Sequence, residues 1–153
     1  SDGSIYISGN TSVGLDGNIM LGNYDAYLAK YDNAGGLLWV SQLGASGAYL
    51  SAKSLALTTT GDIYFTGNTN KGLNGSILSG KTDAYLAKYD NTGAFLSVLE
   101  LGGLGSNDSD DTFGYSVSTS DSGFVYMTGM TRVNLGNNLA QGQLDLFIAK
   151  YLQ

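Results

Sequence analysis

The chain contains no cysteine, no histidine and no proline, and these absences exclude several kinds of chemistry. Without cysteine there is neither a disulfide bond nor a thiol nucleophile. Without histidine, the commonest general base and the usual zinc ligand are also missing. Carboxylate chemistry remains, but the only glutamate is Glu100, which lies within an expected strand, and nothing in the sequence singles out a catalytic pair. We therefore predict no catalytic residues and no cofactor.

Charge is scarce and mostly negative. Charged residues make up 13% of the 153 residues, with a formal net charge of −6. An acidic chain repels phosphate backbones and anionic headgroups, so we expect no nucleic-acid partner. No apolar run approaches the roughly 20 residues of a membrane-spanning helix, so we expect no membrane insertion. Low charge with many small polar residues favours an extracellular or cell-surface bacterial protein.

What the chain has instead is repetition. The octapeptide Asp-Ala-Tyr-Leu-Ala-Lys-Tyr-Asp occurs at residues 25–32 and again at 83–90, with a third, degraded copy from Asp145 to Tyr151. A second motif, ending in Thr11, Thr69 and Thr131, precedes each copy at constant spacing. The copies are 58 and then 62 residues apart, just above the roughly 40 to 50 residues of known propeller blades. The sequence therefore predicts a repeat protein.

The repeats are predicted to form short strands, because apolar residues alternate or form short runs bounded by turn residues. We name the four strands of one unit a to d in chain order. Expected strands cover 4–9 and 26–31 (b and c), 37–42 and 95–100 (d), and 52–58 and 114–119 (a). The 23 glycines, without proline, suit many tight turns. These patterns predict an all-β β-propeller segment of four-stranded antiparallel blades, about two and a half of them, in units of approximately 1–51, 52–113 and 114–153.

The motifs also resemble a known family. Three segments carry the resemblance, in this order: Ile-Tyr-x-x-Gly-Asn-Thr, the octapeptide followed by x-x-Gly, and Leu37-Leu38-Trp39. Together they are similar to the bacterial SBBP repeats, named for the seven-bladed β-propeller. The resemblance covers essentially the whole chain; Ser97 departs from it by replacing the strand-d tryptophan, and Leu152 by replacing an aspartate. It implies an exported or cell-surface protein without assigned catalytic activity. Since closed propellers have about four to eight blades, we expect this chain to be part of a longer one.

Alternation of strand direction places the b–c and d–a connections on one face of such a segment. These are the long connections, running from about 12 to 24, 44 to 51 and 102 to 113, whereas the a–b and c–d links are short turns. Long loops on a rigid scaffold commonly carry binding residues, so we expect this face to bind the partner. The alternative is that the loops only cover the ends of the blades.

One loop suggests a metal. Asn107, Asp108, Asp110 and Asp111 place four oxygen-bearing side chains close together, and calcium takes six to eight oxygen ligands. They form a candidate calcium site, against the alternative of a merely solvated acidic loop. Asp16-Gly17-Asn18 and Asn74-Gly75-Ser76 invite the same idea, but we interpret them as turn formers that adopt the left-handed conformation.

Residues that recur in every unit are interpreted as structural. We expect Asp25, Asp83 and Asp145 to accept hydrogen bonds from loop amides, and the repeated tyrosines to pack between blades. We expect Trp39 to pack between blades as well, with an exposed sugar platform as the alternative.

Three functions remain open at this point. The first is a non-enzymatic extracellular scaffold or interaction module that binds a protein or a cell-surface polysaccharide through the long-loop face. The second is a carbohydrate-binding, lectin-like propeller. The third is a structural subunit of an extracellular fibre that self-associates through incomplete terminal blades.

Overall fold

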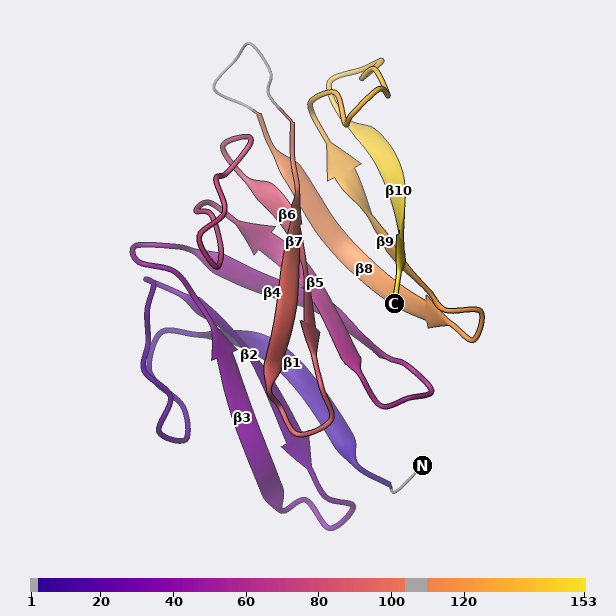
Figure 1. The fold of residues 1–153 in the computed structure, drawn as a ribbon. Coiled ribbons are helices and arrows are strands. Elements are labelled where there is room, and N and C mark those ends of the chain that lie inside the picture. Colours follow the sequence, from indigo (N-terminus) through magenta and orange to yellow (C-terminus); the bar gives the residue numbers. More distant parts are fainter. Residues whose placement is uncertain (1–2, 104–109) are drawn as a thin grey trace.

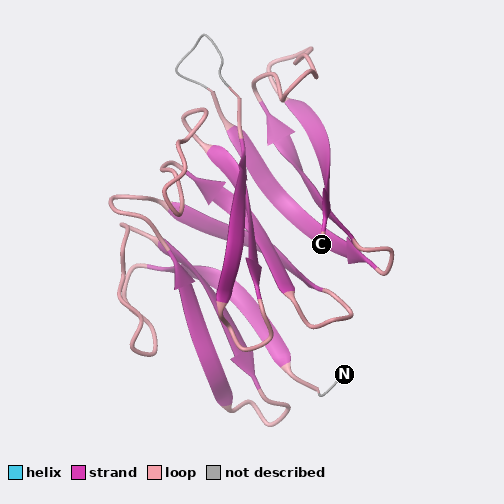
Figure 2. Ribbon diagram, viewed as in Figure 1, coloured by secondary structure: helices cyan, strands magenta, loops and turns pink. Residues whose placement is uncertain are grey.

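The structure, a computed structural model, describes residues 3–103 and 110–153, and every regular element in them is a β-strand (Figures 1 and 2). The strands form three antiparallel sheets that follow one another along the chain. The first sheet has the order β1 (Ile5–Thr11), β2 (Asp25–Tyr31), β3 (Leu37–Leu43). The second has the order β4 (Leu50–Leu57), β5 (Ile63–Thr69), β6 (Asp83–Tyr89), β7 (Phe95–Leu101). The third consists of β8 (Thr112–Ser120), β9 (Phe124–Thr131) and β10 (Asp145–Leu152).

This arrangement confirms the predicted fold class. The second sheet is a complete a-b-c-d blade, the first contains strands b, c and d, and the third contains a, b and c. Strands b and c pair in the same register each time, with Ile5 opposite Tyr31, Ile63 opposite Tyr89 and Val125 opposite Tyr151. The repeated motifs therefore adopt the same local structure in all three sheets.

Strands β4 and β8 each begin two residues earlier than predicted. Their first residues pair with strand b of their own blade and also bind the preceding loop, next to parallel bridges between Tyr24 and Tyr49 and between Thr82 and Asp111. The Leu50 N–H donates to the Tyr24 carbonyl at 3.0 Å, and the Thr112 N–H to the Thr82 carbonyl at 2.8 Å. Successive sheets are thus joined by backbone hydrogen bonds that hydrophobic periodicity does not reveal.

Strand a approaches strand b too closely for a side chain. A β-bulge interrupts the pairing between Ala52 and Ser54, and a Cβ on Gly67 opposite it would lie 1.5 Å from the Ser51 carbonyl oxygen. The third sheet repeats this, since a Cβ on Gly129 would lie 1.8 Å from the Phe113 carbonyl oxygen. The glycine of the repeated b motif is therefore required by the close approach of strand a.

Two hydrophobic clusters hold the three sheets together. The first lies between the first and second sheets and includes Leu28, Ile63, Phe65, Tyr85 and Tyr89. The second lies between the second and third sheets and includes Tyr64, Leu86, Val117, Val125 and Met127. Because both faces of the second sheet are covered, its strands β5 and β6 are almost entirely buried. This is the packing expected for blades stacked side by side.

Trp39 belongs to the first cluster, as predicted. It is half-buried, makes an edge contact with Tyr6 at 6.1 Å between ring centroids, and lies against the Gly93 turn of the second sheet. The neighbouring Ser41 hydroxyl donates to the Gly93 carbonyl at 2.6 Å. Packing between blades, and not a sugar platform, is the role of this tryptophan.

Candidate functional site

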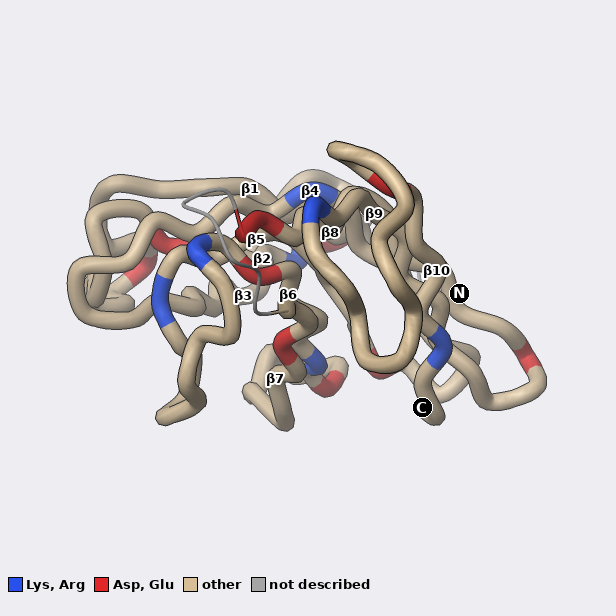
Figure 3. Tube along the Cα trace, turned by 90° about the horizontal axis from the view of Figure 1, so that it is seen from above, with Lys and Arg blue, Asp and Glu red and all other residues tan. Residues whose placement is uncertain are grey.

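The long connections gather at one end of the three sheets (Figure 1), and we call this end the loop face. It consists of the b–c loops 12–24, 70–82 and 132–144 and the d–a loops 44–49 and 102–111, of which 104–109 are not described. The short turns lie at the opposite end. Charged side chains are few and dispersed among uncharged residues (Figure 3). The loop face therefore consists largely of uncharged residues.

Each b–c loop contains a tight turn that an equivalent backbone hydrogen bond closes. The N–H of Asn18 donates to the Leu15 carbonyl at 2.9 Å, and the equivalent bonds from Ser76 to Leu73 and from Asn138 to Leu135 are both 3.0 Å. Positive φ angles at the central positions identify a turn that glycine, asparagine and aspartate tolerate. These residues are Asp16 (47°), Gly17 (81°), Asn74 (52°), Gly75 (84°) and Gly136 (56°). The turn-forming interpretation of Asp16-Gly17-Asn18 and Asn74-Gly75-Ser76 is confirmed.

In the first two sheets strand d anchors this turn. The Leu73 N–H donates to Glu100 Oε1 at 2.7 Å, and the Ser76 hydroxyl donates to Glu100 Oε2 at 2.5 Å. In the first sheet Gln42 takes the same part, since its Oε1 accepts the Leu15 N–H at 2.5 Å. The only glutamate of the chain therefore supports a loop, and a neutral amide serves equally at the equivalent position.

The result is an exposed aliphatic side chain at the same place on every b–c loop. Ile19 is 80% exposed, Ile77 91% and Leu139 68%. Each lies four residues after the leucine that begins the turn, and two of those leucines are buried, Leu73 and Leu135. We call Ile19, Ile77 and Leu139 the aliphatic triplet. Sequence reasoning missed it, although the recurrence of an aliphatic residue at this spacing was visible.

A second feature of the loop face lies at the junction of the first two sheets. Tyr24 and Tyr49 are 46% and 55% exposed, and their ring centroids lie 5.9 Å apart with planes inclined by 31°. The Tyr49 N–H donates to Asn70 Oδ1 at 2.8 Å, which ties the pair to the next b–c loop. Two exposed aromatic rings held side by side are suited to contact a flat apolar group.

The repeated aspartates hold the loops in place, as predicted. Asp83 is fully buried and accepts hydrogen bonds from the N–H groups of Ser79 and Gly80, at 2.7 and 3.0 Å. The equivalent bonds are those from Leu21 and Gly22 to Asp25 and from Gln141 and Gly142 to Asp145. These carboxylates are engaged by backbone donors and serve the scaffold.

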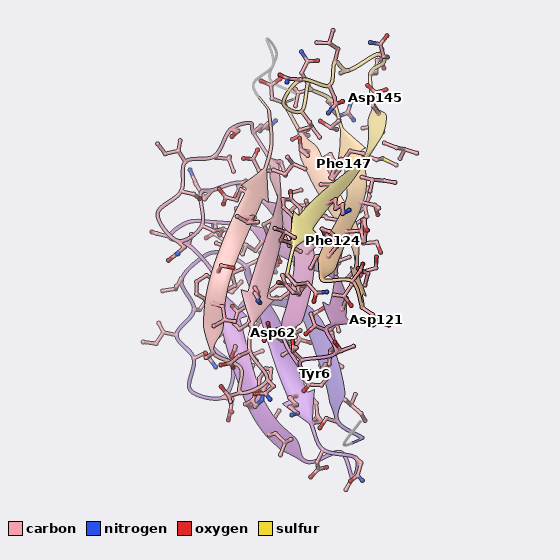
Figure 4. The ribbon with its side chains drawn as sticks, turned by 45° about the vertical axis from the view of Figure 1, so that its right-hand side comes forward. Tyr6, Asp62, Asp121, Phe124, Asp145 and Phe147 are labelled. Carbon is pink, nitrogen blue, oxygen red and sulfur yellow. The ribbon has the colours of Figure 1, made fainter. Side chains whose placement is uncertain are left out.

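The repeated lysines lie over aromatic rings of the neighbouring strand, some of which are labelled in Figure 4. Lys30 lies 5.3 Å from the Tyr6 ring centroid, Lys88 5.4 Å from that of Tyr64, and Lys150 3.6 Å from that of Phe124. Lys88 also forms a 2.8 Å ion pair with Asp62, and this hydrogen bond raises the pKa of the lysine. Repeated cation–π contacts of this kind are structural, not catalytic.

The candidate calcium site falls partly outside the described residues, because Asn107 and Asp108 lie in the segment 104–109. Asp110 accepts backbone hydrogen bonds from Lys81 and Thr82 through its carbonyl. The Asp111 carboxylate lies 3.9 Å from Arg132 Nε. Within residues 3–103 and 110–153, no three acidic side chains gather as a metal site would require. The calcium site remains a prediction.

Stacked antiparallel sheets built from one repeated motif define the chain as a β-propeller-type repeat protein. Residues 38–74 match the family model SBBP, described as a beta-propeller repeat. The matched segment runs from β3 through β4 and β5 to Asn74 in the tight turn of the second b–c loop. The resemblance to SBBP repeats is thereby confirmed over residues 38–74.

A curated relative is "Regulatory protein FlaEY" of Caulobacter vibrioides. It is 26% identical over 168 residues, which cover 99% of this chain and 17% of the relative. The chain therefore spans about a sixth of the length of the curated protein that it matches. In the described residues, 3–103 and 110–153, no helix has the length and apolar character that crossing a membrane requires.

Proposed function

We propose that this chain is a non-enzymatic interaction module whose stacked blades present the loop face to a protein partner. The observation that supports this most directly is the aliphatic triplet. Single exposed apolar residues are common on protein surfaces and need no explanation. Here, however, an aliphatic side chain recurs on three equivalent turns, each with its own backbone hydrogen bond. Presenting apolar groups from preorganised loops lowers the entropic cost of binding a protein surface.

A non-catalytic role fits the chemistry of the described carboxylates. Asp25, Asp83 and Glu100 all accept hydrogen bonds from backbone amides of the b–c loops. With no histidine or cysteine in the chain, neither an imidazole base nor a thiol replaces them. The Caulobacter relative is named as a regulatory protein, which also supports a binding role. We further propose an extracellular or cell-surface location, on the basis of the low charge and the implication of the SBBP resemblance.

Site-specific photocrosslinking tests this proposal. A photoreactive phenylalanine analogue placed at Ile77 should crosslink to protein in a bacterial cell-envelope fraction. The same residue placed at the exposed Asn91, on the short turn at the opposite end, is the matched control. Replacing Ile19 and Leu139 with serine should reduce crosslinking from position 77. Equal crosslinking from positions 77 and 91, or none from position 77, would contradict binding through the loop face.

The Tyr24–Tyr49 pair favours a second candidate, a lectin-like function. Aromatic rings exposed side by side can stack on the apolar face of a sugar. A glycan array probed with the chain and with Tyr24→Ala and Tyr49→Ala variants distinguishes the two candidates. Glycan binding that both variants abolish would favour the lectin, whereas absence of glycan binding leaves the protein partner as the better explanation.

A further inference from the structure

The tight turn of the second b–c loop contains a residue pair that can change its own covalent structure. Asn74 is the only asparagine of the chain that is followed by glycine. Asn74 and Gly75 are both exposed, with φ angles of 52° and 84°. They belong to the middle sheet, which has a neighbouring sheet on each face. Asparagine amides are thermolabile, and their loss begins with an attack by the next backbone nitrogen.

The backbone nitrogen of Gly75 is open to such a reaction. A Cβ built on Gly75 would meet no atom within 4 Å. Among the described residues, neither the Gly75 N–H nor the Asn74 side chain has a hydrogen-bond partner. The turn is closed instead by the bond from the Ser76 N–H to the Leu73 carbonyl. Because glycine also rotates more freely than other residues, little opposes the movement that brings its nitrogen to Asn74 Cγ.

Asn91, in the same sheet, gives the contrast. It is exposed in the short turn between β6 and β7, and Thr92 follows it. The Thr92 N–H donates to Asp90 Oδ1 at 2.8 Å, and the threonine side chain branches at Cβ. The nitrogen that would have to attack Asn91 is therefore both engaged and shielded. Exposure does not distinguish the two asparagines, whereas the following N–H does.

We propose that Asn74 is a self-modifying site, which loses its amide without an enzyme and thereby alters the turn that presents Ile77. The Gly75 nitrogen gives up its proton and forms a bond to Asn74 Cγ. The bond from Cγ to Nδ2 breaks, and Nδ2 leaves as ammonia and carries that proton. Water then opens the cyclic succinimide at one of its two carbonyls. The net reaction consumes one water and releases one ammonia.

Opening at the side-chain carbonyl gives aspartate, which the turn accommodates. Asp16 occupies the equivalent position of the first b–c loop with a φ angle of 47°. The Asn18 N–H there still donates to the Leu15 carbonyl at 2.9 Å. This product therefore adds a negative charge and leaves the backbone of the turn as it was.

Opening at the main-chain carbonyl gives isoaspartate, which breaks the turn. The main chain then runs through the former side chain and is longer by one methylene between Leu73 and Ser76. The Ser76 N–H and hydroxyl both donate to the Leu73 carbonyl, at 3.0 and 2.7 Å, and the Leu73 N–H donates to Ser76 Oγ at 2.9 Å. A lengthened main chain cannot keep these bonds together. Since Leu73 is buried, the displacement falls on Ser76 and on the adjacent Ile77.

Peptide mapping of aged protein tests the modification. The chain without substitutions is incubated in mildly alkaline buffer, where the attacking nitrogen loses its proton more readily, beside a synthetic peptide of residues 70–80. Mass spectrometry should show Asn74 of the folded chain converting to isoaspartate and aspartate well before Asn91 converts. If Asn74 keeps its amide while the peptide converts fully, or if Asn91 converts as fast, the proposal is wrong.

Asn74→Asp and Asn74→Gly are the matched variants, because Asp16 and Gly136 occupy this position in the first and third b–c loops. Hydrogen exchange at the Ser76 amide should be faster in the purified isoaspartate form than in freshly prepared protein. It should be unchanged in Asn74→Asp. Equal protection of the Ser76 amide in the isoaspartate form and in Asn74→Asp would show that the turn survives, and would overturn the effect on Ile77.

The consequence for binding rests on the proposed function, and crosslinking from position 77 measures it. Aged protein should crosslink less than fresh protein, whereas a chain that also carries Asn74→Gly should crosslink equally before and after ageing. Unchanged crosslinking by the isoaspartate form would contradict regulation through this turn. Absence of crosslinking in fresh protein would contradict loop-face binding instead and leave the mapping and exchange results standing, so the two proposals fail separately.

Discussion

At the scale of single residues, one buried carboxylate fixes each of the first two b–c loops. Asp83→Ala would leave the N–H groups of Ser79 and Gly80 without their acceptor inside the protein. We expect the free energy of unfolding to fall by about 2 to 3 kcal/mol, because both bonds go to a charged carboxylate that is fully buried. Urea unfolding followed by circular dichroism measures this change.

Asp145→Ala provides the matched comparison in the third sheet. Asp145 accepts the equivalent bonds from Gln141 and Gly142, but it is only half-buried and those donors are exposed. Water can replace the carboxylate there, so we expect a loss below about 1 kcal/mol. Equal losses for Asp83→Ala and Asp145→Ala would show that burial of the carboxylate is not the cause.

The residue scale also shows why some functional side chains escaped sequence reasoning. Asp25 and Asp83 could be interpreted as structural because they recur in every unit. Ile19, Ile77 and Leu139 recur too, but the exposure of an aliphatic residue is not visible in the sequence, where it counts as a potential core residue. Tyr24 and Tyr49 gave no signal, because only the parallel bridge between these two loop residues brings them together.

At the scale of elements, strand d supports the b–c turn of its own blade through one side chain. Glu100→Gln should change the free energy of unfolding by less than about 1 kcal/mol, since Gln42 already makes the equivalent bond in the first sheet. Glu100→Ala should cost about 1 to 3 kcal/mol, because the Leu73 N–H and the Ser76 hydroxyl both lose their charged acceptor and the N–H keeps only its bond to Ser76 Oγ.

Hydrogen exchange at Leu73 distinguishes the two Glu100 variants locally. Its amide should exchange faster in Glu100→Ala and remain protected in Glu100→Gln. Faster exchange in both variants would mean that the negative charge, and not the acceptor oxygen, holds the turn.

The ends of elements were less predictable than their existence. The pattern of apolar residues correctly located all six strands for which we predicted a residue range, because each motif must pack on both of its faces. The starts of β4 and β8 were wrong by two residues, since Tyr24 and Thr82 bind them from the preceding loop. Such contacts join residues of different units and leave no periodic trace.

At the scale of the whole molecule, the contact between the first two sheets buries tyrosines that should make the fold sensitive to alkali. Burial raises the pKa of Tyr85 and of Tyr89, and the proximity of Tyr89 adds to the effect on Tyr85. Tyrosines in the unfolded chain ionise near pH 10, so above that pH the unfolded state binds fewer protons than the folded state. Stability from these groups is complete below about pH 10 and falls as the pH rises beyond it.

Tyr89→Phe tests this dependence, because it keeps the ring and removes one ionisable group. We expect the free energy of unfolding to decrease less steeply above about pH 10 in this variant than in the unmodified chain. Tyr49→Phe, which makes the same replacement at an exposed tyrosine, is the matched control. A slope that Tyr89→Phe does not alter would show that other groups cause the alkaline loss.

The sequence by itself determined the fold class, the number of strands in each sheet and the end of the sheets at which the long loops lie. It could do so because repeated motifs and alternating apolar residues depend only on neighbours along the chain. Only the tertiary structure decided which aliphatic side chains remain exposed and which loops pair across blades. Those features depend on contacts between distant residues, and burial is set by what packs against a residue rather than by its own type.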